Sequence, residues 1–122
     1  MNIKDIKFKA KRLDNGEWVK GDLIHSTSYV GISYPSDEFS DVPIVHRVDP
    51  STVCMFTGLK DKNGTPIYEG DIIIYKDNNA ERRGTINWDS KTATFCFGCD
   101  FLFHYFSKYM IIINNKFDNK NK

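Results

Sequence analysis

The sequence predicts a mainly β fold with little helix, in which short antiparallel strands form a small barrel-like or sandwich arrangement. Aromatic residues make up 14% of the 122 residues, and aromatic side chains favour strands. Several segments alternate apolar and polar residues with period two, which is typical of half-buried strands. Turn signals recur at roughly 8–12 residues, a spacing that is typical of sandwiches and barrels.

The first strands are predicted from alternation and from one turn signal. Residues 6–11 alternate apolar side chains with lysines, which indicates a strand with a buried face and a basic solvent face. Asn15-Gly16 is the strongest short hairpin signal in the chain, so residues 18–24 are expected to return as a second strand, kinked at Gly21-Asp22. Residues 29–34 predict a third strand, with Gly31 as a bulge.

The middle of the chain predicts a connection between strands. Residues 35–51 contain three prolines and a cluster of acids, and predict an irregular segment with a short extended piece at residues 44–48. Residues 49–52, Asp-Pro-Ser-Thr, are typical of a turn or the start of a helix. Residues 52–57 again resemble a strand.

Two turns and a central strand follow. Residues 60–64 predict a tight turn in which Gly64 has positive φ. Pro66 cannot donate to a sheet, so it is expected at the start or edge of a strand. Residues 69–71 predict a second turn that leads into residues 72–75. That run is apolar on both faces and therefore predicts a central strand.

The last third predicts another hairpin and a closing strand. Residues 77–83 are expected to form a polar loop, and residues 84–88 and 92–97 the two arms of a hairpin that turns at 89–91. Residues 98–109 are compatible with helix or strand, and their aromatic side chains favour strand. Residues 110–113 predict the final strand. We therefore expect one domain over residues 1–113 and a flexible, basic, Asn/Lys-rich tail over residues 114–122.

Charge and cysteine content narrow the class of protein. The formal net charge is only +1, so no field of the whole molecule attracts DNA or a membrane surface. An odd number of cysteines, three, argues against a secreted disulfide framework. The N-terminal residues lack the apolar segment of a signal peptide, and no apolar run approaches the ~20 residues that span a bilayer. The expected location is the cytoplasm, without membrane association.

One segment carries a family resemblance. Residues 57–64, TGLKDKNG, followed by residues 67–72, IYEGDI, resemble the YopX family of phage and prophage proteins. Residues 6–10, 48–53 and 112–119 are similar to that family's first strand, to the segment before its central turn, and to its closing strand and tail. The tail departs from the family pattern: Asn114 stands where a glycine is usual, and residues 120–122 replace a Pro-Glu-Leu.

The resemblance implies a fold and an origin but no chemistry. It implies a mainly β, barrel-like fold and a gene carried by temperate phages or integrated elements, hence a host bacterial cytoplasm. It implies no enzymatic activity and no catalytic residues. The residues that carry it are expected to build the backbone, with glycines at unusual φ and aspartates as turn caps: Gly58, Asp61, Asn63, Gly64, Gly70 and Asp71.

Two groups of residues could carry chemistry. Cys96 and Cys99 form a C-x-x-C pair, and Cys54 with His46 or His104 could complete a zinc site. The favoured interpretation is small apolar side chains, so no metal and no cofactor are expected. Glu69 and Asp71 flank Gly70, a spacing that does not place two carboxylates across a cleft.

A third group suggests nucleic-acid binding. Small barrels bind single strands along a basic groove with aromatic side chains. The residues that fit are Lys60, Lys62, Arg82, Arg83 and Trp88, together with the N-terminal lysines. The competing interpretation is a solvated face whose charges prevent sheet-to-sheet aggregation, and the low net charge favours it.

The functional expectation is a non-catalytic interaction module. We expect an accessory protein that binds an unknown host or phage protein. The alternative is a nucleic-acid-binding protein that acts in phage replication or regulation. Exposed strand edges make self-association a further expectation.

Overall fold

A computed structural model describes residues 2–37, 39, 41–76, 80–98 and 107–118 of the chain. The chain divides into two compact units, Met1–Met55 and Phe56–Lys122, and strand β5 (Cys54–Lys60) begins in the first and ends in the second. Whether the chain folds as one domain stays a prediction.

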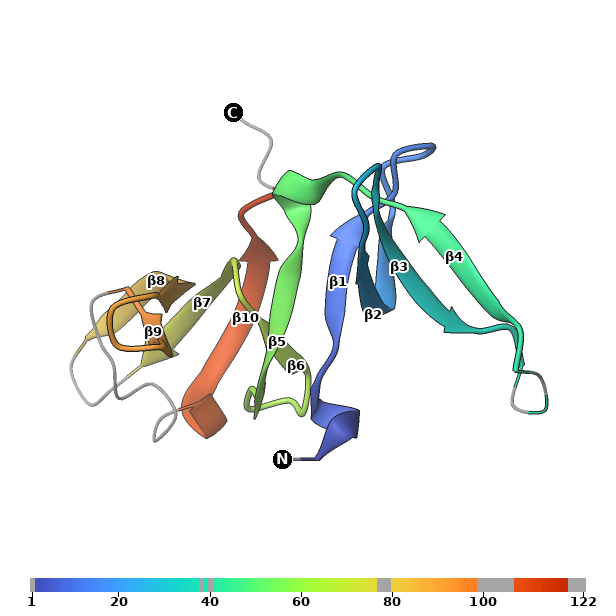
Figure 1. Ribbon diagram of the computed structural model, residues 1–122. Helices are drawn as coiled ribbons and strands as arrows, with labels where there is room; N and C mark the ends of the chain where they lie inside the picture. The colour runs from blue at the N-terminus through green and yellow to red at the C-terminus, as the bar shows by residue number, and fades with distance from the viewer. Residues whose placement is uncertain (1, 38, 40, 77–79, 99–106, 119–122) are drawn as a thin grey trace. The chain divides into compact units, whose positions relative to one another are not determined.

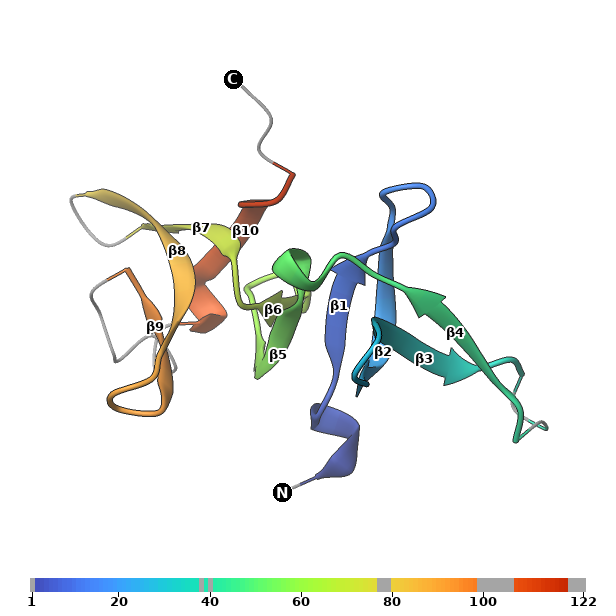
Figure 2. The ribbon, with the colours of Figure 1, turned by 45° about the horizontal axis from the view of Figure 1, so that its top comes forward.

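The first unit is an antiparallel sheet in which neighbours in sequence are neighbours in space. Its strands are β1 (Phe8–Lys11), β2 (Trp18–His25), β3 (Val30–Pro35) and β4 (Pro43–Arg47), in the order β4-β3-β2-β1, and β1 also pairs with the start of β5. Short 3-10 turns lie at Ile3–Asp5 and Pro50–Thr52. Figures 1 and 2 show β3 and β4 as one hairpin.

The core of the first unit lies on one face of this sheet. Ala10, Val19, Ile32 and Val48 are buried together, and Phe8 and other half-buried side chains pack against them. Because side chains alternate across a strand, Lys9 and Lys11 lie on the opposite face. The predicted basic face of the first strand is confirmed.

The second unit contains the remaining strands. β5 pairs with β6 (Pro66–Tyr68), and β7 (Asp71–Lys76), β8 (Glu81–Asp89), β9 (Thr94–Phe97) and β10 (Met110–Asn115) form an antiparallel sheet in the order β10-β7-β8-β9. The predicted central strand is confirmed, since β7 pairs on both sides. A 3-10 turn at Ser107–Tyr109 precedes β10.

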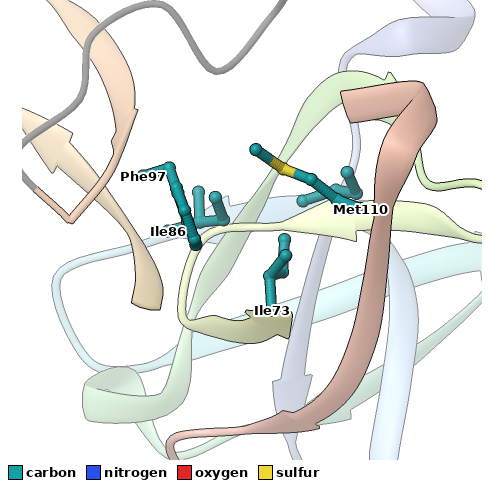
Figure 3. Packing of buried hydrophobic residues seen from close by; sticks show 5 residues of the cluster. Ile73, Ile86, Phe97 and Met110 are labelled. Carbon is teal, nitrogen blue, oxygen red and sulfur yellow. The ribbon is translucent and has the colours of Figure 1, made fainter. Parts of the chain in front are cut away.

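The core of the second unit lies on one face of this four-stranded sheet. Ile67, Ile73, Ile86, Phe97 and Met110 are buried against one another, and Figure 3 shows four of them pointing toward a common centre. Phe97 lies directly over Gly84, where a Cβ atom would approach the Phe97 ring to 2.9 Å. A glycine at position 84 therefore makes room for the largest side chain of this core.

The mainly β class is confirmed, and several finer expectations are corrected. Among the described strands the sheets stay open rather than closing into a barrel, because β4, β6, β9 and β10 each have one partner. Gly31 is no bulge: it pairs in register with both Ile24 and Arg47. Register irregularities instead lie between Phe56 and Lys60 in β5 and between Ile112 and Asn114 in β10.

Two predicted boundaries also move. Residues 81–83, expected in a loop, are the first residues of β8, because each pairs with a residue of β7. The final strand continues to Asn115, two residues into the predicted tail, since Asn115 is buried and pairs with Asp71. Most of residues 98–109, the helix-or-strand segment, lies outside the described residues, as does His104.

Candidate functional site

The five residues predicted to contact nucleic acid lie on several surfaces of the second unit. Lys60 ends β5 and Lys62 lies in the next turn, and both side chains are exposed. The backbone N–H of Lys62 donates to the carbonyl of Met110 at 2.8 Å. This bond fixes the turn against the start of β10.

Arg82 and Arg83 point to opposite faces of β8. Arg82 pairs with Tyr75 on the core face, and its guanidinium carbon lies 5.8 Å from the centre of the Phe97 ring. Arg83 pairs with Ile74 on the other face. Since neighbouring strand residues alternate in direction, these two arginines cannot act as one basic patch.

Trp88 belongs to the same face of β8 as Arg82. Its ring packs edge-to-face on Phe95, with 5.0 Å between the centroids, and 47% of the residue is exposed. Lys62 instead lines a hollow of about 170 Å³ with Ile74, Lys76, Tyr109 and Ile111. Arg82 and Trp88 thus share one face of β8, whereas Lys62 lines a different surface, so the five predicted residues do not form one site.

The signature segment has the backbone role that was predicted for it. Gly58, Gly64 and Gly70 have φ of 86°, 80° and 90°, in the region that favours glycine. The buried carboxylate of Asp61 accepts hydrogen bonds from the N–H groups of Asn63 and Thr65, each at 2.9 Å. It therefore closes the turn, as expected.

Asp71 is the second structural carboxylate. It accepts from the backbone N–H of Tyr68 at 2.8 Å and from the side-chain amide of Asn115 at 3.1 Å. Burial raises the pKa of the Tyr68 hydroxyl, and the charge of Asp71 raises it further. The bonds of Asp71 support a structural role, and Glu69 takes no part in them.

The two described cysteines are buried and satisfied locally. The Cys54 thiol donates to the carbonyl of Thr52 at 3.3 Å, and the Cys96 thiol to that of Asn87 at 3.6 Å. Cys99 lies outside the described residues. Within residues that the structure does describe, no three His, Cys, Asp or Glu side chains gather as metal ligands.

A basic and aromatic surface, which we call the Trp18 face, lies on the first unit. The Nζ atoms of Lys9 and Lys11 lie 4.6 and 5.4 Å from the centre of the Trp18 ring. The register places Lys11 directly opposite Trp18 and Lys9 directly opposite Lys20. Four side chains from two strands therefore form one surface.

The loop that closes the β3–β4 hairpin carries the most exposed described hydrophobic residue. Phe39 is 90% exposed, and its N–H donates to the carboxylate of Asp37 at 2.8 Å. Val42 in the same loop is 69% exposed. Where the two strands meet this loop, Asp22 and Asp41 are among the residues that line a hollow of about 260 Å³.

Sequence reasoning missed Trp18 and Phe39. Trp18 could not have been found from the Asn15-Gly16 signal alone, because a two-residue turn there would pair Trp18 with Leu13, whereas the observed register pairs it with Lys11. The turn itself is longer than the two-residue form, since the N–H of Gly16 donates to the carbonyl of Arg12 at 2.9 Å. Phe39 was missed because residues 35–51 predicted only an irregular connection between strands.

Among the described residues, no helix is long and apolar enough to cross a membrane.

Comparison with known proteins identifies a family. No curated protein matches the chain. The family model described as YopX protein matches residues 7–121 of the 122. That match includes the signature turn, both candidate surfaces and all ten of the described strands, and the chain belongs to the YopX family.

Proposed function

We propose that the chain is a non-catalytic accessory protein of a phage or prophage, which acts in the host cytoplasm by binding a protein partner. The single observation that carries this proposal is the exposed Phe39 at the end of the β3–β4 hairpin. Large side chains that bind into partner pockets dominate the energetics of protein interfaces.

The surroundings of Phe39 define the partner. Asp37 and Asp41 flank it in sequence, and Val42 adds a second exposed apolar side chain. β4 has a single neighbour, β3, among the described strands, and the N–H of Leu13 donates to the carbonyl of its last residue, Arg47, at 3.0 Å, so the part of its outer edge before Arg47 can pair with another chain. A fitting partner has an apolar pocket bordered by lysine or arginine.

Replacement of Phe39 tests the proposal. Tagged wild-type protein, Phe39→Ala and Leu13→Ala are expressed in the phage's host, and co-purifying proteins are quantified by mass spectrometry. Leu13 is 63% exposed in a different loop, so it controls for general stickiness. We expect a partner to be enriched with wild type and Leu13→Ala and lost with Phe39→Ala. Equal recovery with Phe39→Ala would refute this assignment.

A second copy of the chain is one candidate partner. Sedimentation velocity on purified protein distinguishes this case, because self-association through the hairpin depends on concentration and is abolished by Phe39→Ala. A wild-type protein that stays monomeric across the concentration range directs the search to host or phage proteins.

Nucleic-acid binding in phage replication or regulation is the second candidate function. The observation that favours it is the Trp18 face, since lysines and an aromatic ring on one surface are the elements of such sites. It requires retention on nucleic acid that falls steeply with salt.

A further inference from the structure

We infer that Phe39 of one copy of the chain inserts into a hollow on the second unit of another copy, so that copies associate head to tail. This inference rests on the proposed function and deepens it, because it identifies the partner that receives Phe39. The hollow, which we call the Tyr109 hollow, measures about 170 Å³ and is lined by Lys62, Ile74, Lys76, Tyr109 and Ile111.

The apolar part of the Tyr109 hollow lies on the face of its sheet opposite the core. Ile74 and Ile111 are direct cross-strand partners. Their sequence neighbours Ile73 and Met110 are buried in the core, and side chains alternate between the two faces of a strand. Both isoleucines are half-buried and Tyr109 is 55% exposed. An apolar side chain that enters the hollow therefore covers apolar surface that is in contact with water.

The size of the hollow suits one large side chain. Pockets that hold small-molecule ligands measure roughly 300–1,000 Å³, well above the volume of about 170 Å³ found here. A phenylalanine ring in this space would pack on Ile74 and Ile111 and form an aromatic pair with Tyr109. The hollow is thus better matched to a side chain of another protein than to a free ligand.

The charge around the hollow is mainly positive. Lys62 and Lys76 belong to its lining. Arg83 pairs in register with Ile74 and adds a third cation to this face, while Glu81 pairs in register with Lys76 and adds one anion. Among these described residues, cations exceed anions, so an acidic partner is favoured.

The loop that carries Phe39 has the complementary character. Asp37 and Asp41 lie two residues to either side of Phe39, and the Asp37 carboxylate accepts the N–H of Phe39 at 2.8 Å. Phe39 is 90% exposed and Val42 is 69% exposed. An apolar, acidic loop fits an apolar, basic hollow, whereas two such loops or two such hollows would repel each other. A second copy of this chain therefore supplies the fit.

A contact of this kind does not close on itself. Each copy has one Phe39 loop and one Tyr109 hollow, so a pair of copies joined by one contact leaves a loop and a hollow unused. Such heterologous contacts build rings or open chains of copies rather than a symmetric dimer. The inference thus predicts assemblies larger than a dimer.

Sedimentation velocity on two complementary variants tests the pairing. Phe39→Ala keeps the hollow and loses the inserted ring, and Lys62→Glu/Lys76→Glu keeps the ring and reverses the charge of the hollow. We expect wild-type protein to form species larger than a dimer as its concentration rises. Each variant alone should require a concentration about 10-fold or more higher to associate. An equimolar mixture should form a dimer and nothing larger, because only one contact in each pair is intact.

A matched control makes the same change of net charge elsewhere on the second unit. Lys60 and Lys91 are exposed and do not line the hollow, so Lys60→Glu/Lys91→Glu should associate as wild-type protein does. Thermal unfolding of each variant shows that it is folded.

The outcomes separate this inference from the proposed function. A wild-type protein that stays monomeric overturns the head-to-tail contact, while loss of a host or phage protein with Phe39→Ala would still support partner binding. Association that Phe39→Ala abolishes and Lys62→Glu/Lys76→Glu leaves intact overturns the hollow as the receiving site. Folded variants whose mixture forms no dimer, or equal weakening by Lys60→Glu/Lys91→Glu, also overturn the inference.

Discussion

Asp61 shows how a single buried carboxylate can hold distant parts of the second unit together. Besides closing its own turn, it accepts a hydrogen bond from the backbone N–H of Ile112 at 3.1 Å. The residue is 6% exposed, so water cannot replace an acceptor that is removed. One side chain therefore satisfies three backbone donors from two segments.

Replacing Asp61 with Ala should destabilise the protein by about 3 kcal/mol, because buried donors left without an acceptor cost about 1–3 kcal/mol each and are not additive. Asp61→Asn should lose less, since its amide oxygen still accepts. Urea unfolding measures both. The control is Asp37→Ala, at an exposed carboxylate, expected within about 0.5 kcal/mol of wild type. A loss for Asp61→Ala no larger than for the control contradicts the assignment.

Asp14 provides a test of charge at the surface. Its carboxylate accepts two hydrogen bonds from Arg12, at 2.9 and 2.7 Å. This pairing lowers the pKa of Asp14 below its ordinary value of 3.8. The lowered pKa means that the pair's small contribution to stability is present above pH 3.8 and is lost as pH falls through the pKa of the folded state.

Carboxyl NMR titration should show the pKa of Asp14 returning toward its ordinary value in Arg12→Gln. Lys20→Gln removes the same charge elsewhere and should leave the pKa of Asp14 in place. An unchanged midpoint in Arg12→Gln would show that the pair is absent in solution.

At the scale of elements, the approach of β2 to β3 depends on Gly21. A Cβ atom at this position would lie 2.2 Å from the carbonyl oxygen of Ser33. Backbone cannot yield to that contact without separating the two strands. The predicted kink at Gly21-Asp22 thus corresponds to a close approach of two backbones, between strands that remain paired in register.

Gly21→Ala should destabilise the first unit by about 2–4 kcal/mol through this overlap. Gly16→Ala is the matched control, because nothing lies within 4 Å of its Cβ position and only its φ of 73° is unfavourable. That strain is worth about 1 kcal/mol. Thermal or urea unfolding of both variants measures their losses of stability. Equal losses for Gly21→Ala and Gly16→Ala would argue against the close approach.

The elements themselves could be read largely from local pattern. Alternation located β1 and its basic face, and turn chemistry located Gly64, Pro66 and the residues around Gly70. The predicted strand boundaries were wrong where tertiary contacts determine the end of a strand. β8 begins as early as Glu81 because β7 offers pairing partners to its first residues. β10 continues to Asn115 because the Asp71 carboxylate accepts a hydrogen bond from the Asn115 side-chain amide.

The candidate site was less predictable for a geometric reason. Arg82 and Arg83 are adjacent in sequence and so appeared to form a patch, but a strand sends them to opposite faces. Lys11 and Trp18 are separated in sequence and meet through the hairpin register. Surfaces on sheets are assembled by pairing, which composition alone does not reveal.

At the scale of the whole molecule, the described residues form two buried hydrophobic clusters, one in each unit. Ile32 belongs to one buried cluster and Ile73 to the other. The two described cysteines are distributed in the same way, with Cys54 in the first unit and Cys96 in the second, 1% and 6% exposed. Their thiols can therefore report on each unit separately.

Thiol labelling of Cys99→Ser should show both remaining cysteines protected, each with its own free energy of opening. Buried thiols react only when the surrounding structure opens, and we expect each core to open by itself. The measurement is labelling rate against low denaturant, with each site resolved by mass spectrometry. Identical protection and identical denaturant dependence would show that the two units open as one.

The bonds to β10 also constrain the order in which the chain can fold during synthesis. The signature segment, residues 57–72, supplies its partners: the N–H of Lys62 to the carbonyl of Met110, the Asp61 carboxylate to Ile112, and the Asp71 carboxylate to Asn115. β7 needs β10 as well. Until residues 110–115 have left the ribosome, this donor and these two acceptors lack their partners. The second unit therefore completes itself late, while the sheet of the first unit can already have formed.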